Sequence, residues 1–149
     1  MVKIQQLSRW LFLIVLGGCT VVPAAPLPQV TVYKDPLCGC CAKWITHMKK
    51  DGWPMNVIAF REHFNVPQSL QSCHTSTIDN YVFEGHIPSD YIERFLREKP
   101  NVRGLAVPAM PLNSPGMESR ASRDARYVIY SFTENGEIKE YAYVTRVEQ

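Results

Sequence analysis

The pattern of apolar and polar positions predicts a strand, a helix and a second strand at the start of the folded region. Val30 to Tyr33 alternates β-branched and aromatic residues, which is typical of a strand. From Cys41 to Gly52, apolar side chains recur at helical spacing while lysines and other polar residues fall on the opposite side. Met55 to Phe60 is apolar again. This order predicts a β-α-β unit with two parallel strands.

The following residues extend this pattern. Strands are predicted at Ser69–Thr75 and at Tyr81–Gly85, with a turn at Asp79-Asn80 between them. A helix capped by Ser89 follows and ends before Pro100. The whole order predicts an α/β fold with a thioredoxin-like β-α-β-β-β-α core.

Two further segments follow that core. Residues 100–124 are rich in proline and glycine and contain two methionines, so we expect a long ordered loop. Tyr127–Phe132 and Ile138–Val144 flank Asn135-Gly136, which predicts a C-terminal β-hairpin.

The first 18 residues have the pattern of an export signal. Lys3 and Arg9 precede a run of seven apolar residues, which is too short to span a bilayer as a helix. The run ends in Leu-Gly-Gly-Cys19, which resembles the lipobox of bacterial lipoproteins, so we expect Cys19 to carry lipid. Ordinary cleavage near Ala24 or Ala25, with Cys19 discarded, is the alternative. We expect a Pro-rich spacer over 19–29, a folded domain over 30–149 and a periplasmic, membrane-anchored protein.

Composition and charge narrow the class of protein. The 149 residues are 46% hydrophobic and 20% charged, as expected for one globular domain. Removal of the signal would leave 14 basic and 14 acidic residues, and this neutral balance argues against a nucleic-acid partner. Export to an oxidising compartment implies that the remaining thiols are oxidised or bound to a metal.

The residues Cys38-Gly39-Cys40-Cys41 place three thiols at the start of the first predicted helix. The free N–H groups and the dipole of a helix N-terminus lower the pKa of a thiol, so Cys38 suits a nucleophile or a metal ligand. Cys40 stands where a thioredoxin has proline. A third thiol adds little to disulfide exchange, whereas Cu(I) prefers thiolate and thioether ligands.

Other uses of the thiols have to be weighed. Structural zinc sites usually take two Cys-rich knuckles, but here a single cluster is joined only by the distant Cys73. Iron–sulfur clusters favour wider spacing. Two disulfides, Cys38–Cys41 and Cys40–Cys73, would simply staple an exported domain. A thiol–disulfide oxidoreductase would use Cys38 as nucleophile and Cys41 as resolving thiol.

Several further residues could add soft or borderline donors. Met110 and Met117 lie in the Pro/Gly-rich loop, and His86 lies at a strand end. His74 follows Cys73 directly, so strand alternation would place their side chains on opposite faces unless the backbone is irregular there. The remaining candidates are assigned to the core (Met48, Met55) or to the solvated surface (His47, His63).

Four stretches in order resemble the exported copper-resistance proteins of the CopG family, which are unrelated to the repressors of that name. They are VYKDPLCGCCAKW, VPQSLQSCHT, YVFEGHIP and GLAVPAMPLNSPGM. The resemblance implies a thioredoxin-like fold that binds copper through the cysteine cluster and Cys73, with Met110 and Met117 as further participants. It also suggests Pro67 as a counterpart of the thioredoxin cis-proline. Ala109, where glycine is expected, and the lipobox are departures from the family.

The resulting hypothesis is an envelope copper-binding protein of copper resistance. Cu(I) would be bound by the Cys-x-Cys-Cys cluster together with the distant Cys73, with copper redox coupled to thiol redox. Its partners would be copper ions and a copper efflux system or a periplasmic copper carrier. Whether it is an enzyme stays open, with the thiol–disulfide oxidoreductase as the alternative.

Overall fold

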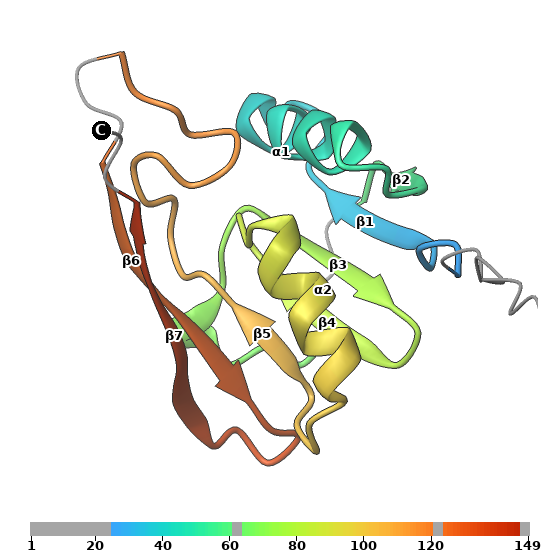
Figure 1. The fold of residues 1–149 in the computed structure, drawn as a ribbon, viewed down its shortest axis with the longest axis vertical. Coiled ribbons are helices and arrows are strands. Elements are labelled where there is room, and N and C mark those ends of the chain that lie inside the picture. Colours follow the sequence, from blue (N-terminus) through green and yellow to red (C-terminus); the bar gives the residue numbers. More distant parts are fainter. Residues whose placement is uncertain (1–24, 61–63, 121–123, 147–149) are drawn as a thin grey trace, which may run out of the picture.

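A seven-stranded mixed sheet with two helices packed on it forms the described part of the chain (Figure 1). The computed structural model describes residues 25–60, 64–120 and 124–146. The elements in chain order are β1 (Val30–Lys34), α1 (Gly39–Lys50), β2 (Met55–Ile58), a 3-10 helix (Gln68–Leu70), β3 (His74–Ile78), β4 (Tyr81–Glu84), α2 (Ser89–Glu98), β5 (Gly104–Ala106), β6 (Ala125–Phe132) and β7 (Ile138–Arg146).

The strand order in the sheet is β2-β1-β3-β4-β5-β6-β7. The pairs β1–β2 and β4–β5 are parallel, and the other neighbouring pairs are antiparallel. The predicted order β-α-β-β-β-α is therefore confirmed. The predicted hairpin is confirmed as well, since β6 and β7 pair around a turn in which Gly136 has a φ of 80°.

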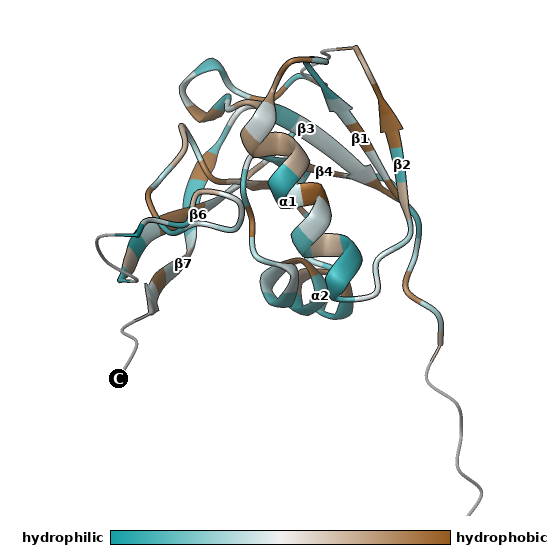
Figure 2. Cartoon of the chain, turned by 90° about the horizontal axis from the view of Figure 1, so that it is seen from above, coloured by the Kyte–Doolittle hydropathy of each residue, from teal (hydrophilic) through white to brown (hydrophobic). Residues whose placement is uncertain are grey.

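Both helices cover the same face of the sheet (Figures 1 and 2). Trp44 and Met48 of α1 and Phe95 of α2 are fully buried in one apolar cluster with Phe83 of β4. The prediction that Met48 belongs to the core is confirmed. The opposite face holds a smaller cluster, in which the segment before β3 packs on β4, β5 and β6 through Val66, Leu70, Val82, Ala106 and Phe132.

Two predicted elements are wrong in their extent. Residues 69–73 are not strand: Gln68–Leu70 is a 3-10 helix, and β3 begins only at His74. Leu70 is buried in the smaller apolar cluster, so this segment bends to cover the sheet rather than to join it. The region 100–124 is not all loop, because Gly104–Ala106 forms β5. A strand of three residues is too short to show a period in the sequence.

Two predictions for single residues are also wrong. Ser89 is the first residue of α2 rather than its cap, which is Pro88, and the Ser89 hydroxyl donates to the Asp51 carboxylate. Pro67 is not a cis-proline, because none of the described peptide bonds is cis. It precedes the 3-10 helix instead, where its fixed φ suits the turn.

The predicted signal peptide over 1–18, the lipidated Cys19 and the first part of the spacer lie outside the described residues and stay predictions. The same holds for His63. Among the described residues, no helix is long and apolar enough to cross a membrane.

Candidate metal centre

A tight turn after β1 places the three cysteines at the start of α1. The Asp35 side chain accepts a hydrogen bond from the Leu37 N–H at 2.7 Å, and the Cys38 N–H donates to the Asp35 carbonyl at 3.1 Å. Cys38 is the N-cap of the helix, and its Sγ accepts from the Cys41 N–H at 3.3 Å. The predicted position of the thiols at a helix N-terminus is therefore confirmed.

The four cysteines of the folded region are in two redox states. Cys38 and Cys41 form a disulfide, whereas Cys40 and Cys73 are free thiols. The Cys40 Sγ lies 3.4 Å from the Cys38 Sγ and 4.0 Å from the Cys73 Sγ. Of the two disulfides weighed from the sequence, the first is present and the second is absent.

Cys73, the residue immediately before β3, joins this cluster. The four Sγ atoms of Cys38, Cys40, Cys41 and Cys73 all lie within 4.8 Å of one another. Burial, together with the neighbouring Cys40, raises the pKa of Cys73 to about 12. Without a metal ion, Cys73 therefore keeps its proton at neutral pH, and a bound metal ion would have to displace it.

Two buried histidines lie on the inner side of Cys73. The Cys73 Sγ is 2.9 Å from Nε2 of His86 and 3.4 Å from Nδ1 of His74, and these three ligand atoms also lie within 4.8 Å of one another. The backbone irregularity that a joint site of Cys73 and His74 requires is present. Cys73 precedes β3, so the alternation of strand side chains does not apply to it.

The orientation of His86 is set by the loop that follows β5. Its Nδ1 lies 2.7 Å from the Pro115 carbonyl, so Nδ1 carries the proton and Nε2 presents its lone pair to Cys73. Burial lowers the pKa of His86, which keeps the ring neutral. The His74 ring packs against Trp44, with ring centroids 4.4 Å apart. Both rings thus have fixed positions around Cys73.

The two loop methionines are placed differently. The Met110 Sδ lies 3.6 Å from the Cys40 Sγ, and Met110 is 47% exposed. Met117 is half-buried, and its described bonds are backbone bonds to Ser114 and Asn113 rather than contacts with the thiols. The structure therefore brings Met110 to the cluster and gives no such contact for Met117.

The sequence alone did not identify Glu84, which hydrogen-bonds the residues on either side of Cys73 and His74. Glu84 is fully buried on the sheet face opposite the helices, where its carboxylate accepts from the Ser72 N–H at 2.6 Å and from the Thr75 hydroxyl at 2.5 Å. A signal was available, since an acidic residue within an otherwise apolar strand is unusual unless it is paired.

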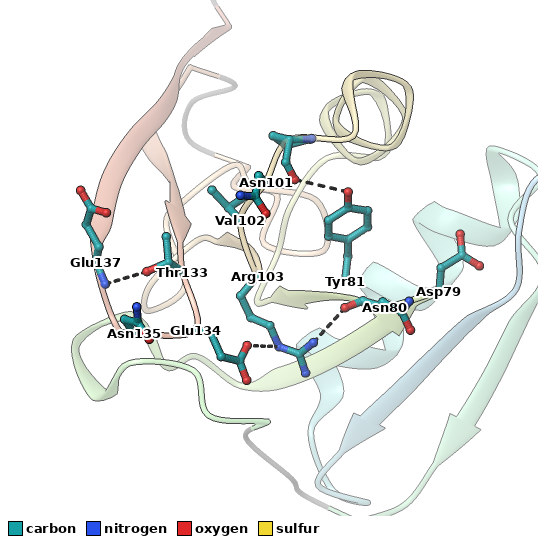
Figure 3. A pocket seen from close by; sticks show the side chains of 11 residues that line it. Asp79, Asn80, Tyr81, Asn101, Val102, Arg103, Thr133, Glu134, Asn135 and Glu137 are labelled. Carbon is teal, nitrogen blue, oxygen red and sulfur yellow. Dashed lines mark hydrogen bonds and ion pairs between the residues drawn. The ribbon is translucent and has the colours of Figure 1, made fainter.

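A polar pocket of about 600 Å³ lies away from these thiols, at the other end of β3 (Figure 3). It lies between the β3–β4 turn, the segment before β5 and the β6–β7 turn. Arg103 bridges two of its walls, through an ion pair with Glu134 at 3.1 Å and a hydrogen bond to the Asn80 carbonyl at 2.9 Å. None of the predicted site residues lines this pocket.

The fold and the cysteine cluster define a class of protein, a mixed α/β protein with soft sulfur donors gathered at the start of a helix. The model of a family described as a protein of unknown function, DUF411, matches residues 70–117. Two solved structures titled copper resistance protein copG are also similar. Form 1 is 36% identical in sequence, and the match covers 80% of this chain and 98% of the Form 1 chain with a TM-score of 0.70. Form 2 is 34% identical, and the match covers 79% of this chain and 98% of the Form 2 chain with a TM-score of 0.70. A search of curated proteins finds no match. The chain belongs to the CopG family of copper resistance proteins.

Proposed function

We propose that the protein binds Cu(I) in the cell envelope and contributes to copper resistance. The observation that carries this proposal is the convergence of four Sγ atoms within 4.8 Å, from Cys38, Cys40, Cys41 and Cys73. Thiolates at this spacing can bridge metal ions, so few ligands can hold more than one Cu(I). The similarity to two proteins named for copper resistance supports the choice of metal.

The donor set around the thiols fits copper better than zinc. Met110 adds a thioether on the exposed side of Cys40, and thioethers are ligands for Cu(I) rather than for zinc. His86 and His74 add imidazole nitrogens on the buried side of Cys73. All four thiolates become available only when two electrons reduce the Cys38–Cys41 disulfide to two thiolates. Copper binding and thiol redox would therefore be coupled.

We also propose that the first part of the chain is thioredoxin-like. The strand order β2-β1-β3-β4, with β3 antiparallel to both of its neighbours and both helices on one face, supports this topology. Export to the periplasm, a lipid anchor at Cys19 and exchange of copper with an efflux system or a carrier complete the proposal.

Anaerobic titration of the reduced protein with Cu(I) against a competing chelator tests copper binding. The wild type should compete for Cu(I), and Cys38→Ser or Cys73→Ser should lose most of that affinity because each removes a bridging thiolate. Met55→Leu, at the start of β2 and far along the sheet from the cysteines, is the control and should bind like the wild type. Unchanged affinity in both cysteine variants would refute the proposal.

A thiol–disulfide oxidoreductase is the second candidate function. The observation in its favour is the Cys38–Cys41 disulfide at the N-terminus of α1, where the helix dipole favours the thiolate form of Cys38 after reduction. This function predicts disulfide exchange with a protein substrate that survives Cys40→Ser and Cys73→Ser. Loss of exchange in either of these two variants would exclude it.

A further inference from the structure

Ser72 joins the two segments that bring sulfur donors to the helix. Its backbone N–H donates to the buried carboxylate of Glu84 at 2.6 Å, and its hydroxyl donates to the carbonyl of Ala109. Cys73 follows Ser72 in the chain, and Met110 follows Ala109. One serine is therefore bonded on one side to the sheet and on the other to the loop that carries the thioether.

The loop has an unusual backbone at this point of attachment. Ala109 has a φ of 58°, in the left-handed region that residues other than glycine rarely adopt. Because the intrinsic preference of alanine opposes this conformation, contacts with the rest of the protein have to maintain it. The hydrogen bond from Ser72 to the Ala109 carbonyl is such a contact.

Close packing keeps Ser72 in position. A Cβ atom on Gly85 would lie 2.8 Å from the Ser72 Oγ and 2.4 Å from the Val107 carbonyl oxygen, and Gly85 has a φ of 77°. Three segments, those of Ser72, Gly85 and Val107, thus meet where a side chain at position 85 would not fit. The Ser72 side chain is therefore in close contact with Gly85 on one side.

The loop held by Ser72 places the Met110 thioether beside the thiol of Cys40. The Met110 Sδ lies 3.6 Å from the Cys40 Sγ, which in turn lies 4.0 Å from the Cys73 Sγ. Ser72 therefore links the two residues next to it and Ala109 in sequence, Cys73 and Met110, and both of these lie beside Cys40. Because Met110 is 47% exposed and stands on the solvent side of Cys40, its position depends on the loop backbone.

We propose that Ser72 is a positioning residue whose hydroxyl holds Met110 against Cys40. The thioether then covers Cys40 and serves as the solvent-side donor to Cu(I). The role of Met110 as a Cu(I) donor rests on the proposed copper binding. The position of Met110 over Cys40 does not, because it can be measured without copper.

A double-mutant cycle on the reduced protein tests the link through Cu(I) affinity. Ser72→Ala keeps the N–H bonded to Glu84 and removes the hydroxyl. Because this hydroxyl also hydrogen-bonds the Cys73 thiol, the alkylation of Cys40 described below is the readout specific to Met110. It should lower Cu(I) affinity about tenfold, the lower end of what loss of an outer partner of a metal ligand costs. Met110→Leu should have the same effect, and the double variant should be no weaker than either single variant. Ser131→Ala, which removes a hydroxyl bonded to the Lys139 carbonyl, is the control and should bind like the wild type.

Alkylation of the copper-free protein tests the same link without any metal. With the Cys38–Cys41 disulfide intact, mass spectrometry can follow iodoacetamide modification of Cys40. Ser72→Ala and Met110→Ala should raise the Cys40 rate by the same factor of about three or more, whereas Ser131→Ala should leave it unchanged.

The two experiments separate the inference from the proposed function. A wild type that fails to bind Cu(I) refutes the proposed function, and the alkylation rates still decide whether Ser72 positions Met110. Wild-type alkylation in Ser72→Ala overturns the inference. So does a double variant whose Cu(I) affinity falls by the product of the two single effects, or a Met110→Leu variant without effect.

Discussion

Glu84 shows how a single side chain can position a site that it does not touch. Its carboxylate is fully buried and accepts hydrogen bonds from Ser72 and Thr75, the residues on either side of the Cys73-His74 pair. A buried carboxylate is costly unless it is well bonded, so these two hydrogen bonds both stabilise Glu84 and hold the start of β3. Cys73 thereby has a fixed place opposite the helix.

Replacement of Glu84 by leucine should therefore destabilise the fold. Ser72 and Thr75 would lose this acceptor, and each buried donor deprived of its partner costs about 1–3 kcal/mol. We expect the free energy of unfolding in urea to fall by about 3 kcal/mol. Glu84→Gln, which keeps the shape and an acceptor oxygen, is the control and should lose about 1 kcal/mol or less. A leucine variant as stable as the wild type would contradict the role assigned to Glu84.

At the scale of elements, β5 joins the two parts of the sheet. It pairs with β4 on one side and with β6 on the other, so the backbone pairing between the C-terminal hairpin and the first four strands runs through these three residues. The approach is close at Gly104, where a Cβ atom would lie 1.7 Å from the Val82 carbonyl oxygen. Glycine is required here by space rather than by φ.

Gly104→Ala should accordingly disrupt the β4–β5 pairing. The added methyl group meets backbone that cannot rotate away, and we expect a loss of about 3 kcal/mol or more, the upper end of the cost of overpacking. Gly39→Ala in the first turn of α1 is the matched control. A Cβ atom there meets nothing within 4 Å, and better helix propensity should raise stability by up to about 1 kcal/mol. Thermal or urea unfolding measures both changes, and equal stability of the two variants would contradict this explanation.

At the scale of the whole molecule, the two halves of the chain meet at the cysteine cluster. The helix N-terminus supplies Cys38, Cys40 and Cys41, the start of β3 supplies Cys73, and the loop after β5 supplies Met110. The same loop supports the site from the other side, since Pro115 orients His86 and a Cβ atom on Gly116 would lie 2.9 Å from the Cys40 carbonyl oxygen. A ligand bound at this junction would tie distant segments together.

Cu(I) should therefore stabilise the reduced protein against unfolding. Binding to the folded state alone contributes about 2.7 kcal/mol when free Cu(I) is one hundred times the dissociation constant, which corresponds to a rise of about 5–10 °C in Tm. The form with the Cys38–Cys41 disulfide has two of its four thiols blocked and should gain much less. Calorimetry of both forms with buffered Cu(I) measures the difference. An equal rise in both would show that Cys38 and Cys41 do not bind the metal.

Much of the fold could be predicted because its elements are periodic. The pattern of β1, α1 and β2, the amphipathic α2 and the hairpin around Asn135-Gly136 all follow from local residue preferences. The failures lie where tertiary contacts decide. The segment of Leu70 leaves the expected strand so that Leu70 packs on the sheet. The three residues of β5 form a strand because they hydrogen-bond to β4 and β6.

The candidate site divides in the same way. The sequence by itself determined which donors the chain offers, because three thiols at a helix N-terminus and the motifs around them already indicated soft-metal chemistry and the CopG family. Only the tertiary structure decided the arrangement: which methionine reaches Cys40, why Cys73 and His74 can face one centre, and which buried residues hold them. The physical reason is that donor chemistry belongs to single side chains, whereas distances between donors 30 to 70 residues apart depend on how the sheet brings their segments together.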